Sequence, residues 1–344
     1  MQMNALAKIS EPKETKCGWL AIAACLVLAV ICRAEAANVS SAGKASTTPE
    51  SPAQYANPII GGAADPDVIR YEGLFYAYVS GYRVYSSKDL VHWTPGPKIF
   101  KGRTGLWAPD VYFNPTDKTF YLYYSCDNPD TSSNNAPKKL IGVATSSTPD
   151  GNFVDQGILT SGIDPHLFAD EDGSFYLFTK ASATANPETS NDGIFVNKMT
   201  DLTHLGPTTT CYDTPSKEPI AEAPFVLKHN GIYYLLYSYN GAKGPNYAVG
   251  YATSSDPVGP FTPYSGNPIV SRDAQVFGPG HGSVIVDDAG KLWHVYHQKD
   301  EEAYGWERSV CIDPIWFDEQ GVLHSQATRN TMQDAPTIKV PTAE

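Results

Sequence analysis

One pattern of residues occurs five times along this chain, and it restricts the possible folds more than any other feature. Each copy has a Pro or Gly, a few mostly apolar residues, a polar turn and then a dense aromatic run. The aromatic runs begin 45 to 59 residues apart and cover residues 73–80, 118–125, 173–179, 231–238 and 290–297. Repeats of this length that contain only strands and turns are typical of β-propellers. The sequence therefore predicts an all-β protein, a five-bladed β-propeller.

The N-terminal residues have a composition that differs from the repeats. Three lysines precede an uncharged run of about 15 residues at 18–32, and Arg33 and the sequence Ala-Glu-Ala follow it. This pattern predicts a secretory signal peptide over residues 1–36, and hence a secreted or periplasmic protein. The alternative is a membrane anchor, but the run is shorter than the roughly 20 residues that span a bilayer. We expect a flexible leader over residues 37–56, rich in Ala, Ser, Thr and Pro, and a single catalytic propeller domain over residues 57–344.

Composition narrows the choice of partner. The chain has 37 acidic and 25 basic residues and a formal net charge of −12. Such a charge disfavours binding to nucleic acid and, after signal cleavage, to membranes, but it does not affect a neutral polysaccharide or oligosaccharide. We expect a monomer. Three cysteines, Cys126, Cys211 and Cys311, follow the signal region, and they form either one disulfide with a leftover thiol or three buried free thiols.

Three carboxylates and one histidine occupy similar places in different repeats. Asp65 and Asp164 each precede a Pro directly before the first strand of a repeat, Glu222 lies one residue further upstream in its repeat, and His281 begins the fifth. Equivalent positions of a propeller converge on its axis, so we expect one site. Small apolar neighbours favour a protonated Glu222 that acts as an acid, and turn donors favour an ionised Asp65 that acts as a base. Glycoside hydrolysis requires one carboxyl group that acts as an acid and another that acts as a base or nucleophile.

Other polar and aromatic residues near these positions have two possible interpretations each. His281 is either a metal or substrate ligand or a structural histidine, and Trp107 is either a sugar platform or a core residue. Arg308 contacts a substrate or catalytic carboxylate, or it is an ordinary surface residue. We interpret His294 and His297 as ordinary strand residues. The chain has no Gly-x-Ser-x-Gly, Cys-x-x-Cys, His-Glu-x-x-His or phosphate-loop motif, which argues against those chemistries.

Five short motifs in order resemble glycoside hydrolase family 43, and the resemblance covers about residues 57–325. They are Ala-Asp-Pro-Asp-Val (64–68), Trp-Ala-Pro-Asp-Val (107–111), Ile-Asp-Pro-His-Leu-Phe (163–168) with Asp-Gly (172–173), Glu-Ala-Pro (222–224) and Gly-His-Gly-Ser (280–283). The resemblance implies a five-bladed propeller that cleaves α-L-arabinofuranosidic or β-xylosidic bonds with inversion. The family's appended β-sandwich, common in β-xylosidases, has no counterpart here, which favours arabinose-containing substrates.

The resemblance also implies a role for each site residue. Asp65 would be the general base, Glu222 the general acid, and Asp164 the residue that tunes the pKa of Glu222 and holds it in place. His281 would lie near the axis and help to hold a calcium or other ion through water, which makes calcium the one expected cofactor. Trp107, Arg308 and His281 would lie on the substrate side.

Two further functions remain as alternatives. A five-bladed fructan-type enzyme would be retaining, and its carboxyl groups would lie about 5–5.5 Å apart rather than the roughly 6.5–9.5 Å of an inverting enzyme. A sugar-binding propeller without catalysis is the third interpretation. The presence of all three carboxylates argues against it.

Overall fold

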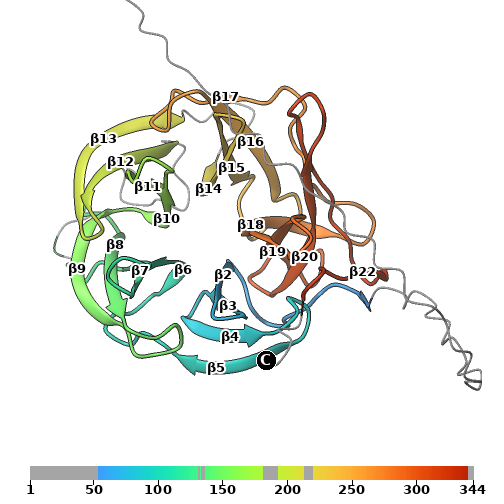
Figure 1. The fold of residues 1–344 in the computed structure, drawn as a ribbon, viewed down its shortest axis with the longest axis horizontal. Coiled ribbons are helices and arrows are strands. Elements are labelled where there is room, and N and C mark those ends of the chain that lie inside the picture. The colour runs from blue at the N-terminus through green and yellow to red at the C-terminus, as the bar shows by residue number, and fades with distance from the viewer. Residues whose placement is uncertain (1–52, 131, 133–135, 181–192, 213–219, 340–344) are drawn as a thin grey trace, which may run out of the picture. The chain divides into compact units, whose positions relative to one another are not determined.

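Five four-stranded antiparallel sheets make up a β-propeller in the computed structural model, which describes residues 53–130, 132, 136–180, 193–212 and 220–339. The sheets surround a central axis as blades (Figure 1). Blade 1 contains β2 (Asp67–Tyr71), β3 (Leu74–Val79), β4 (Arg83–Ser87) and β5 (Trp93–Lys98); blade 2 contains β6 (Trp107–Asn114), β7 (Thr119–Asp127), β8 (Lys139–Ser146) and β9 (Val154–Ser161). Blade 3 contains β10 (Ile163–Ala169), β11 (Phe175–Lys180), β12 (Ile194–Asp201) and β13 (His204–Tyr212); blade 4 contains β14 (Ala221–His229), β15 (Ile232–Tyr239), β16 (Ala248–Ser254) and β17 (Thr262–Pro263). Blade 5 contains β18 (Phe277–Val286), β19 (Leu292–Lys299), β20 (Arg308–Phe317) and β21 (Leu323–Ser325).

The aromatic runs of the sequence form the second strand of every blade, which confirms the predicted fold class. These strands, β3, β7, β11, β15 and β19, are buried along almost their whole length. A strand that packs against a neighbouring blade on each face has no solvent side, so it is apolar continuously rather than at alternate residues. The described residues contain no α-helix, and among them no helix is long and apolar enough to cross a membrane.

The core is divided into five clusters, each of which joins two adjacent blades. Phe75 of blade 1 and Trp293 of blade 5 belong to the same cluster, for example, and so do Leu236 of blade 4 and Ile315 of blade 5. The cohesion of the ring therefore comes from packing between blades, which is the largest favourable contribution to folding. The three cysteines that follow the predicted signal, Cys126, Cys211 and Cys311, are buried and none of them is joined in a disulfide, so the second of the two cysteine alternatives is confirmed.

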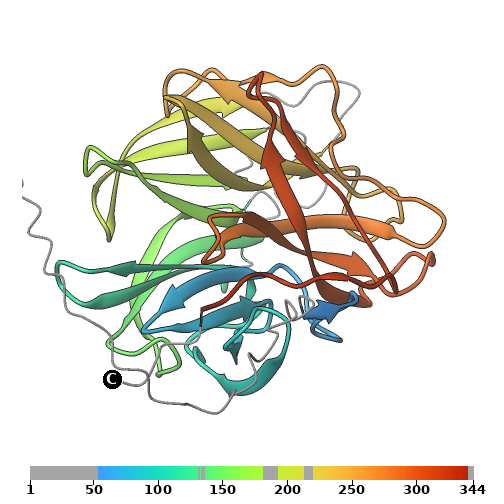
Figure 2. The same ribbon diagram turned by 45° about the vertical axis from the view of Figure 1, so that its right-hand side comes forward.

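The ring closes where the first and last described segments meet. β1 (Gln54–Tyr55) pairs with β22 (Gln333–Asp334), and both views show the two segments side by side near blade 5 (Figures 1 and 2). The Tyr55 side chain is buried and its hydroxyl donates to the Ile312 carbonyl at 2.7 Å. The predicted leader over 37–56 is thus wrong at its last residues, because an aromatic residue among polar ones anchors them. The rest of that leader to residue 52, and the predicted signal peptide, lie outside the described residues.

Candidate active site

All six residues that the sequence analysis assigned to the site line one pocket of about 490 Å³. They are Asp65, Trp107, Asp164, Glu222, His281 and Arg308. The pocket lies where the first strands of the blades begin, and every blade contributes at least one of the six. Its volume is within the roughly 300–1,000 Å³ of typical small-molecule sites. The convergence predicted from the repeat position is therefore confirmed.

Each blade has a left-handed non-glycine residue within its first strand or just before it. The five φ angles lie between 44° and 56°, at Asp65, Ala108, Asp164, Ala223 and His281. Non-glycine residues adopt this conformation rarely and at an energetic cost. The turn directs a side chain toward the axis: in blades 1, 3 and 5 the left-handed residue lines the pocket itself, while in blades 2 and 4 the preceding residue, Trp107 or Glu222, does so.

A hydrogen bond from each left-handed residue to the preceding blade holds this geometry. In three blades the backbone N–H donates to a serine at the end of the neighbouring aromatic strand. These pairs are Ala108 with Ser80 (3.0 Å), Asp164 with Ser125 (3.0 Å) and His281 with Ser238 (2.9 Å). The other two blades use site residues instead: the Ala223 N–H donates to Asp164 Oδ2 at 3.0 Å, and the Asp65 nitrogen lies 3.4 Å from His297 Nδ1.

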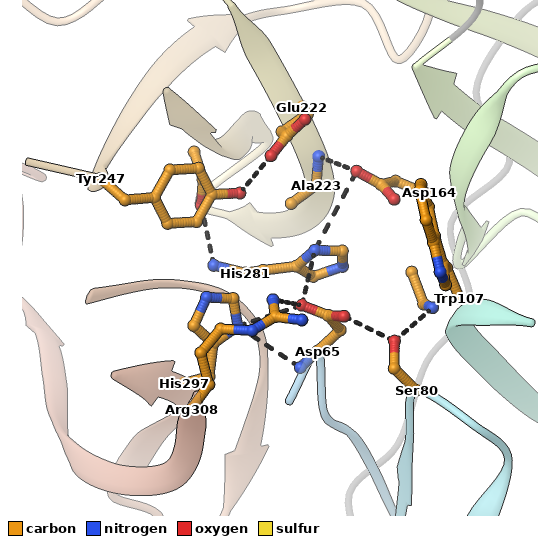
Figure 3. A network of polar contacts seen from close by, with 12 residues as sticks. Asp65, Ser80, Trp107, Asp164, Glu222, Ala223, Tyr247, His281, His297 and Arg308 are labelled. Carbon is orange, nitrogen blue, oxygen red and sulfur yellow. Dashed lines mark hydrogen bonds and ion pairs between the residues drawn. The ribbon is translucent and has the colours of Figure 1, made fainter. Parts of the chain in front are cut away.

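Asp65 is a buried carboxylate surrounded by groups that favour its ionised form. Its Oδ1 accepts a hydrogen bond from Arg308 at 2.8 Å, and its Oδ2 accepts one from Ser80 Oγ at 2.5 Å (Figure 3). The Nδ1 atoms of His281 and His297 lie 3.4 and 3.1 Å from Oδ1. Burial alone would raise the pKa of Asp65, but Arg308 and the two histidines outweigh it and hold the pKa well below its usual value. The side chain is therefore ionised, through a cation and imidazoles rather than the turn donors we expected.

Asp164 and Glu222 form a second group of carboxyls, and their surroundings favour the protonated form. Each is less than a tenth exposed, and burial raises the pKa of both. The charge of Glu222 raises the pKa of Asp164 further, whereas a hydrogen bond from the Tyr247 hydroxyl to Glu222 Oε1, at 2.8 Å, partly offsets the rise for Glu222. Because two neighbouring buried carboxyls resist double ionisation, this pair retains a proton at pH values where exposed carboxyls have lost theirs.

The two histidines of the network are neutral near pH 7. Burial lowers the pKa of His281 despite the nearby Asp65, and it lowers the pKa of His297 to about 4. The interpretation of His297 as an ordinary strand residue is wrong, because its ring contacts Asp65 from the neighbouring blade. His294, on the same strand, does behave as a core residue: it is buried and stacked on Tyr296.

The surroundings of His281 do not suit a directly bound calcium ion. Calcium takes six to eight oxygen ligands, and the described residues contain no group of three or more His, Cys, Asp or Glu that could hold a metal. The two carboxylates nearest to His281 Nδ1 are Asp65, already paired with Arg308, and Asp164 at 4.0 Å. An ion held through water stays a prediction of the resemblance.

Aromatic side chains form one wall of the pocket. The rings of Trp107 and Trp306 lie 6.3 Å apart, and Trp306 is 46% exposed. The Lys139 ammonium lies over the Trp107 ring, 3.4 Å from its centroid, and therefore covers one face of it. Trp306 and the more exposed Tyr304 come from the β19–β20 connection, and both line the pocket although the sequence analysis did not assign them.

Sequence reasoning also missed Ser80 and Tyr247. Ser80, Ser125 and Ser238 each end an aromatic run, and this repeated serine is a sequence signal that could have identified Ser80. Tyr247 lies in a loop outside the repeat pattern, and nothing in the sequence near it indicates a contact with Glu222.

Comparisons with known proteins agree with this geometry. The family model for glycosyl hydrolases family 43 matches residues 55–323. The β-D-galactofuranosidase xynD of Aspergillus niger is 28% identical over 80% of this chain and 86% of its own length. The arabinan endo-1,5-α-L-arabinosidase C of Emericella nidulans is 27% identical over 71% of this chain and 86% of its own length. The crystal structure of a thermostable family-43 glycoside hydrolase is 31% identical, covers 83% of this chain and all of that chain, and gives a TM-score of 0.73. With its five-bladed fold and its converging carboxylates, the chain therefore belongs to glycosyl hydrolases family 43 and is a glycoside hydrolase.

Proposed function

We propose that this protein is a secreted, inverting glycoside hydrolase that cleaves α-L-arabinofuranosidic or β-xylosidic bonds in plant cell-wall arabinan or arabinoxylan. The observation that carries the proposal is the contrast between its carboxyl groups. Asp65 is held ionised by Arg308, while the Asp164–Glu222 pair is buried and retains a proton. A pair of carboxyl groups whose pKa values are pushed apart supplies one acid and one base.

Each carboxyl group has a defined task in this mechanism. Glu222 gives its proton to the glycosidic oxygen, the bond from that oxygen to the anomeric carbon breaks, and the leaving alcohol departs. A water molecule attacks the opposite face of the sugar and gives its proton to Asp65. Asp164 raises the proton affinity of its partner through charge repulsion and, by accepting the Ala223 N–H, fixes the backbone next to Glu222. In Figure 3, Asp65 and Glu222 lie on opposite sides of the network, as two groups acting on opposite faces of a sugar require.

The pocket, the net charge and the relatives all support a neutral sugar as substrate. Two of the similar proteins are named as a β-D-galactofuranosidase and an arabinan endo-1,5-α-L-arabinosidase, whose substrates are neutral glycans. The net charge of −12 does not hinder a neutral glycan. Trp107 and Trp306 supply flat apolar surfaces of the kind that stack on sugar rings.

Product stereochemistry tests the proposal most directly. Purified protein is incubated with arabinan, arabinoxylan and the 4-nitrophenyl α-L-arabinofuranoside, β-D-xylopyranoside and β-D-galactofuranoside, and the first-formed sugar is followed by proton NMR. We expect release of arabinose or xylose with the anomeric configuration opposite to that of the substrate. A retained configuration would support the fructan-type alternative, and tight glycan binding without any hydrolysis would support the sugar-binding alternative.

Secretion and a monomeric state are part of the proposal. Both rest on the sequence: the pattern of residues 1–36 and the net charge of −12. N-terminal sequencing of protein recovered from the periplasm or culture medium is expected to begin at Ala37, and light scattering is expected to give the mass of one chain. Recovery of uncleaved protein in the membrane fraction would instead favour the anchor.

A further inference from the structure

The Tyr247 hydroxyl donates a hydrogen bond to Glu222 Oε1 at 2.8 Å (Figure 3). The tyrosine is fully buried and lies directly before β16. Neither the repeat pattern nor the assigned roles of the three carboxylates gives this residue a function. Its contact with the proposed acid is nevertheless direct.

The position of the Tyr247 ring is fixed by its neighbours. It stacks on the ring of His297, with the centroids 5.7 Å apart and the planes inclined by 4°. Gly280 presses against the ring so closely that a side chain at that position would overlap it. Because the ring cannot shift without disturbing blade 5, the hydroxyl is held in place before substrate arrives.

A protonated carboxyl has one oxygen that carries the proton and one that only accepts. Since Oε1 accepts from Tyr247, the proton of Glu222 belongs on Oε2. We propose that Tyr247 is a positioning residue that keeps the acidic proton on the Glu222 oxygen facing the leaving group. This inference rests on the proposed function, in which Glu222 is the general acid.

The same contact assists the proton transfer. When the Oε2–H bond breaks and the proton moves to the glycosidic oxygen, the electron pair of the broken C–O bond leaves with that oxygen and Glu222 becomes a carboxylate. The hydrogen bond from Tyr247 then has a charged acceptor, and charge-assisted hydrogen bonds are shorter and stronger than neutral ones. Tyr247 thus stabilises the conjugate base of the acid.

Tyr247→Phe tests this role, because it removes the hydroxyl and keeps the stacked ring. Tyr123→Phe is the matched control: that tyrosine is also fully buried, and its hydroxyl donates to the Leu202 carbonyl in blade 3 at 2.8 Å. The other charged groups that act on Glu222 are Asp164, Lys180, Asp65 and Arg308, and both variants keep them.

We expect Tyr247→Phe to lower kcat on arabino-oligosaccharides about tenfold, the factor that corresponds to one hydrogen bond of ordinary net strength, with little change in KM. Activity on 4-nitrophenyl glycosides should fall less, because that leaving group departs without a proton. The alkaline limb of the pH–rate profile should move to higher pH, since the lost bond favours the ionised form of Glu222. Tyr123→Phe should reproduce the wild-type profile.

The limb position and the ratio of activities on the two substrates do not depend on how much of a preparation is folded, so a loss of stability in the variant leaves the test valid. If wild-type protein is active and Tyr247→Phe keeps both the wild-type limb and the wild-type ratio, the inference is wrong while the proposed function stands. If wild-type protein hydrolyses no substrate of the panel, the proposed function fails and this inference falls with it.

Discussion

Asp65 shows how one buried carboxylate is kept ionised by residues distant in the sequence. The cation that pairs with it, Arg308, is 243 positions away along the chain and the two histidines come from blade 5. A buried charge without such partners would recover its proton instead. The ionised state therefore depends on correct assembly of blades 1 and 5 and not on the local sequence around Asp65.

Removing the cation tests this dependence. In Arg308→Gln, burial is no longer outweighed and the pKa of Asp65 should rise. A general base works only when ionised, so activity is lost as the pH falls through its pKa, and the acidic limb of kcat/KM should move to higher pH. Arg83→Gln, in which an exposed arginine that binds the Gly96 carbonyl is replaced, is the control and should leave the limb unchanged. An unchanged limb in Arg308→Gln would refute the assignment.

Leaving-group dependence separates the base from the acid. Asp65→Ala should reduce hydrolysis of every substrate by the roughly 10²–10⁴-fold typical of general acid–base groups. Glu222→Ala should be as severe on natural glycosides and milder on 4-nitrophenyl glycosides, which do not need protonation. Steady-state rates on natural and 4-nitrophenyl glycosides check this. If Glu222→Ala loses equal activity on the two substrate types, Glu222 is not the general acid.

Asp164 should affect the alkaline limb in the direction opposite to Tyr247. Asp164→Asn keeps an oxygen that can accept the Ala223 N–H but removes the negative charge. Without that charge, Glu222 ionises more easily, its pKa falls, and the limb should move to lower pH. A pH–rate series on this variant measures the shift, and a move to higher pH would contradict the proposed repulsion.

At the scale of strands, the ring depends on a small amount of pairing between its ends. β1 and β22 are two residues long each, and a single bridge joins Ile60 to Val310. Asn57 reinforces this seam from a buried position: its side chain donates to the Ile312 carbonyl and accepts from the Ile312 N–H. The seam lies close in sequence to both Asp65 and Arg308. A change that loosens the seam should therefore also disturb the ion pair that keeps Asp65 ionised.

Asn57→Ala should therefore lower stability and activity together. The change leaves the buried Ile312 N–H without its partner, while the Ile312 carbonyl keeps the Tyr55 hydroxyl. One such unsatisfied buried group costs about 1–3 kcal/mol. We expect a loss of about 1–3 kcal/mol in the free energy of unfolding by urea denaturation, with inactivation at a lower temperature. Asn114→Ala serves as the control, because this half-buried residue ends β6 and its side chain accepts a local hydrogen bond from the Thr116 N–H. Unfolding of the Asn57 variant at the wild-type urea concentration would show that the seam contributes little.

For the whole molecule, the repeats determined how much could be predicted from sequence. The fold and the convergence of Asp65, Asp164 and Glu222 followed from their shared repeat position. The role of Tyr247 did not, because this residue lies in a loop outside the repeat pattern although its partner Glu222 belongs to the same blade. The role of His297 did not, because its contact with Asp65 crosses from one blade to the next, and such contacts leave no mark on the adjacent sequence. The end of the leader was misplaced for the same reason: Tyr55 is ordered by a partner more than 250 residues away.

A closed ring whose ends meet has no necessary starting point. Gln54 pairs with Asp334, while the turn at Asn230–Gly231 lies at the end of β14 and β15 remote from Glu222 and Ser238. A circular permutant of residues 53–339, with those ends joined by a short linker and new ends at this turn, should retain the wild-type kcat on aryl glycosides. A permutant that folds but is inactive would show that the order of the blades along the chain matters to the chemistry. A permutant with wild-type kcat would show that the site requires the closed ring of blades but not a particular order of the blades along the chain. New chain ends would then be tolerated at any turn far from the axis.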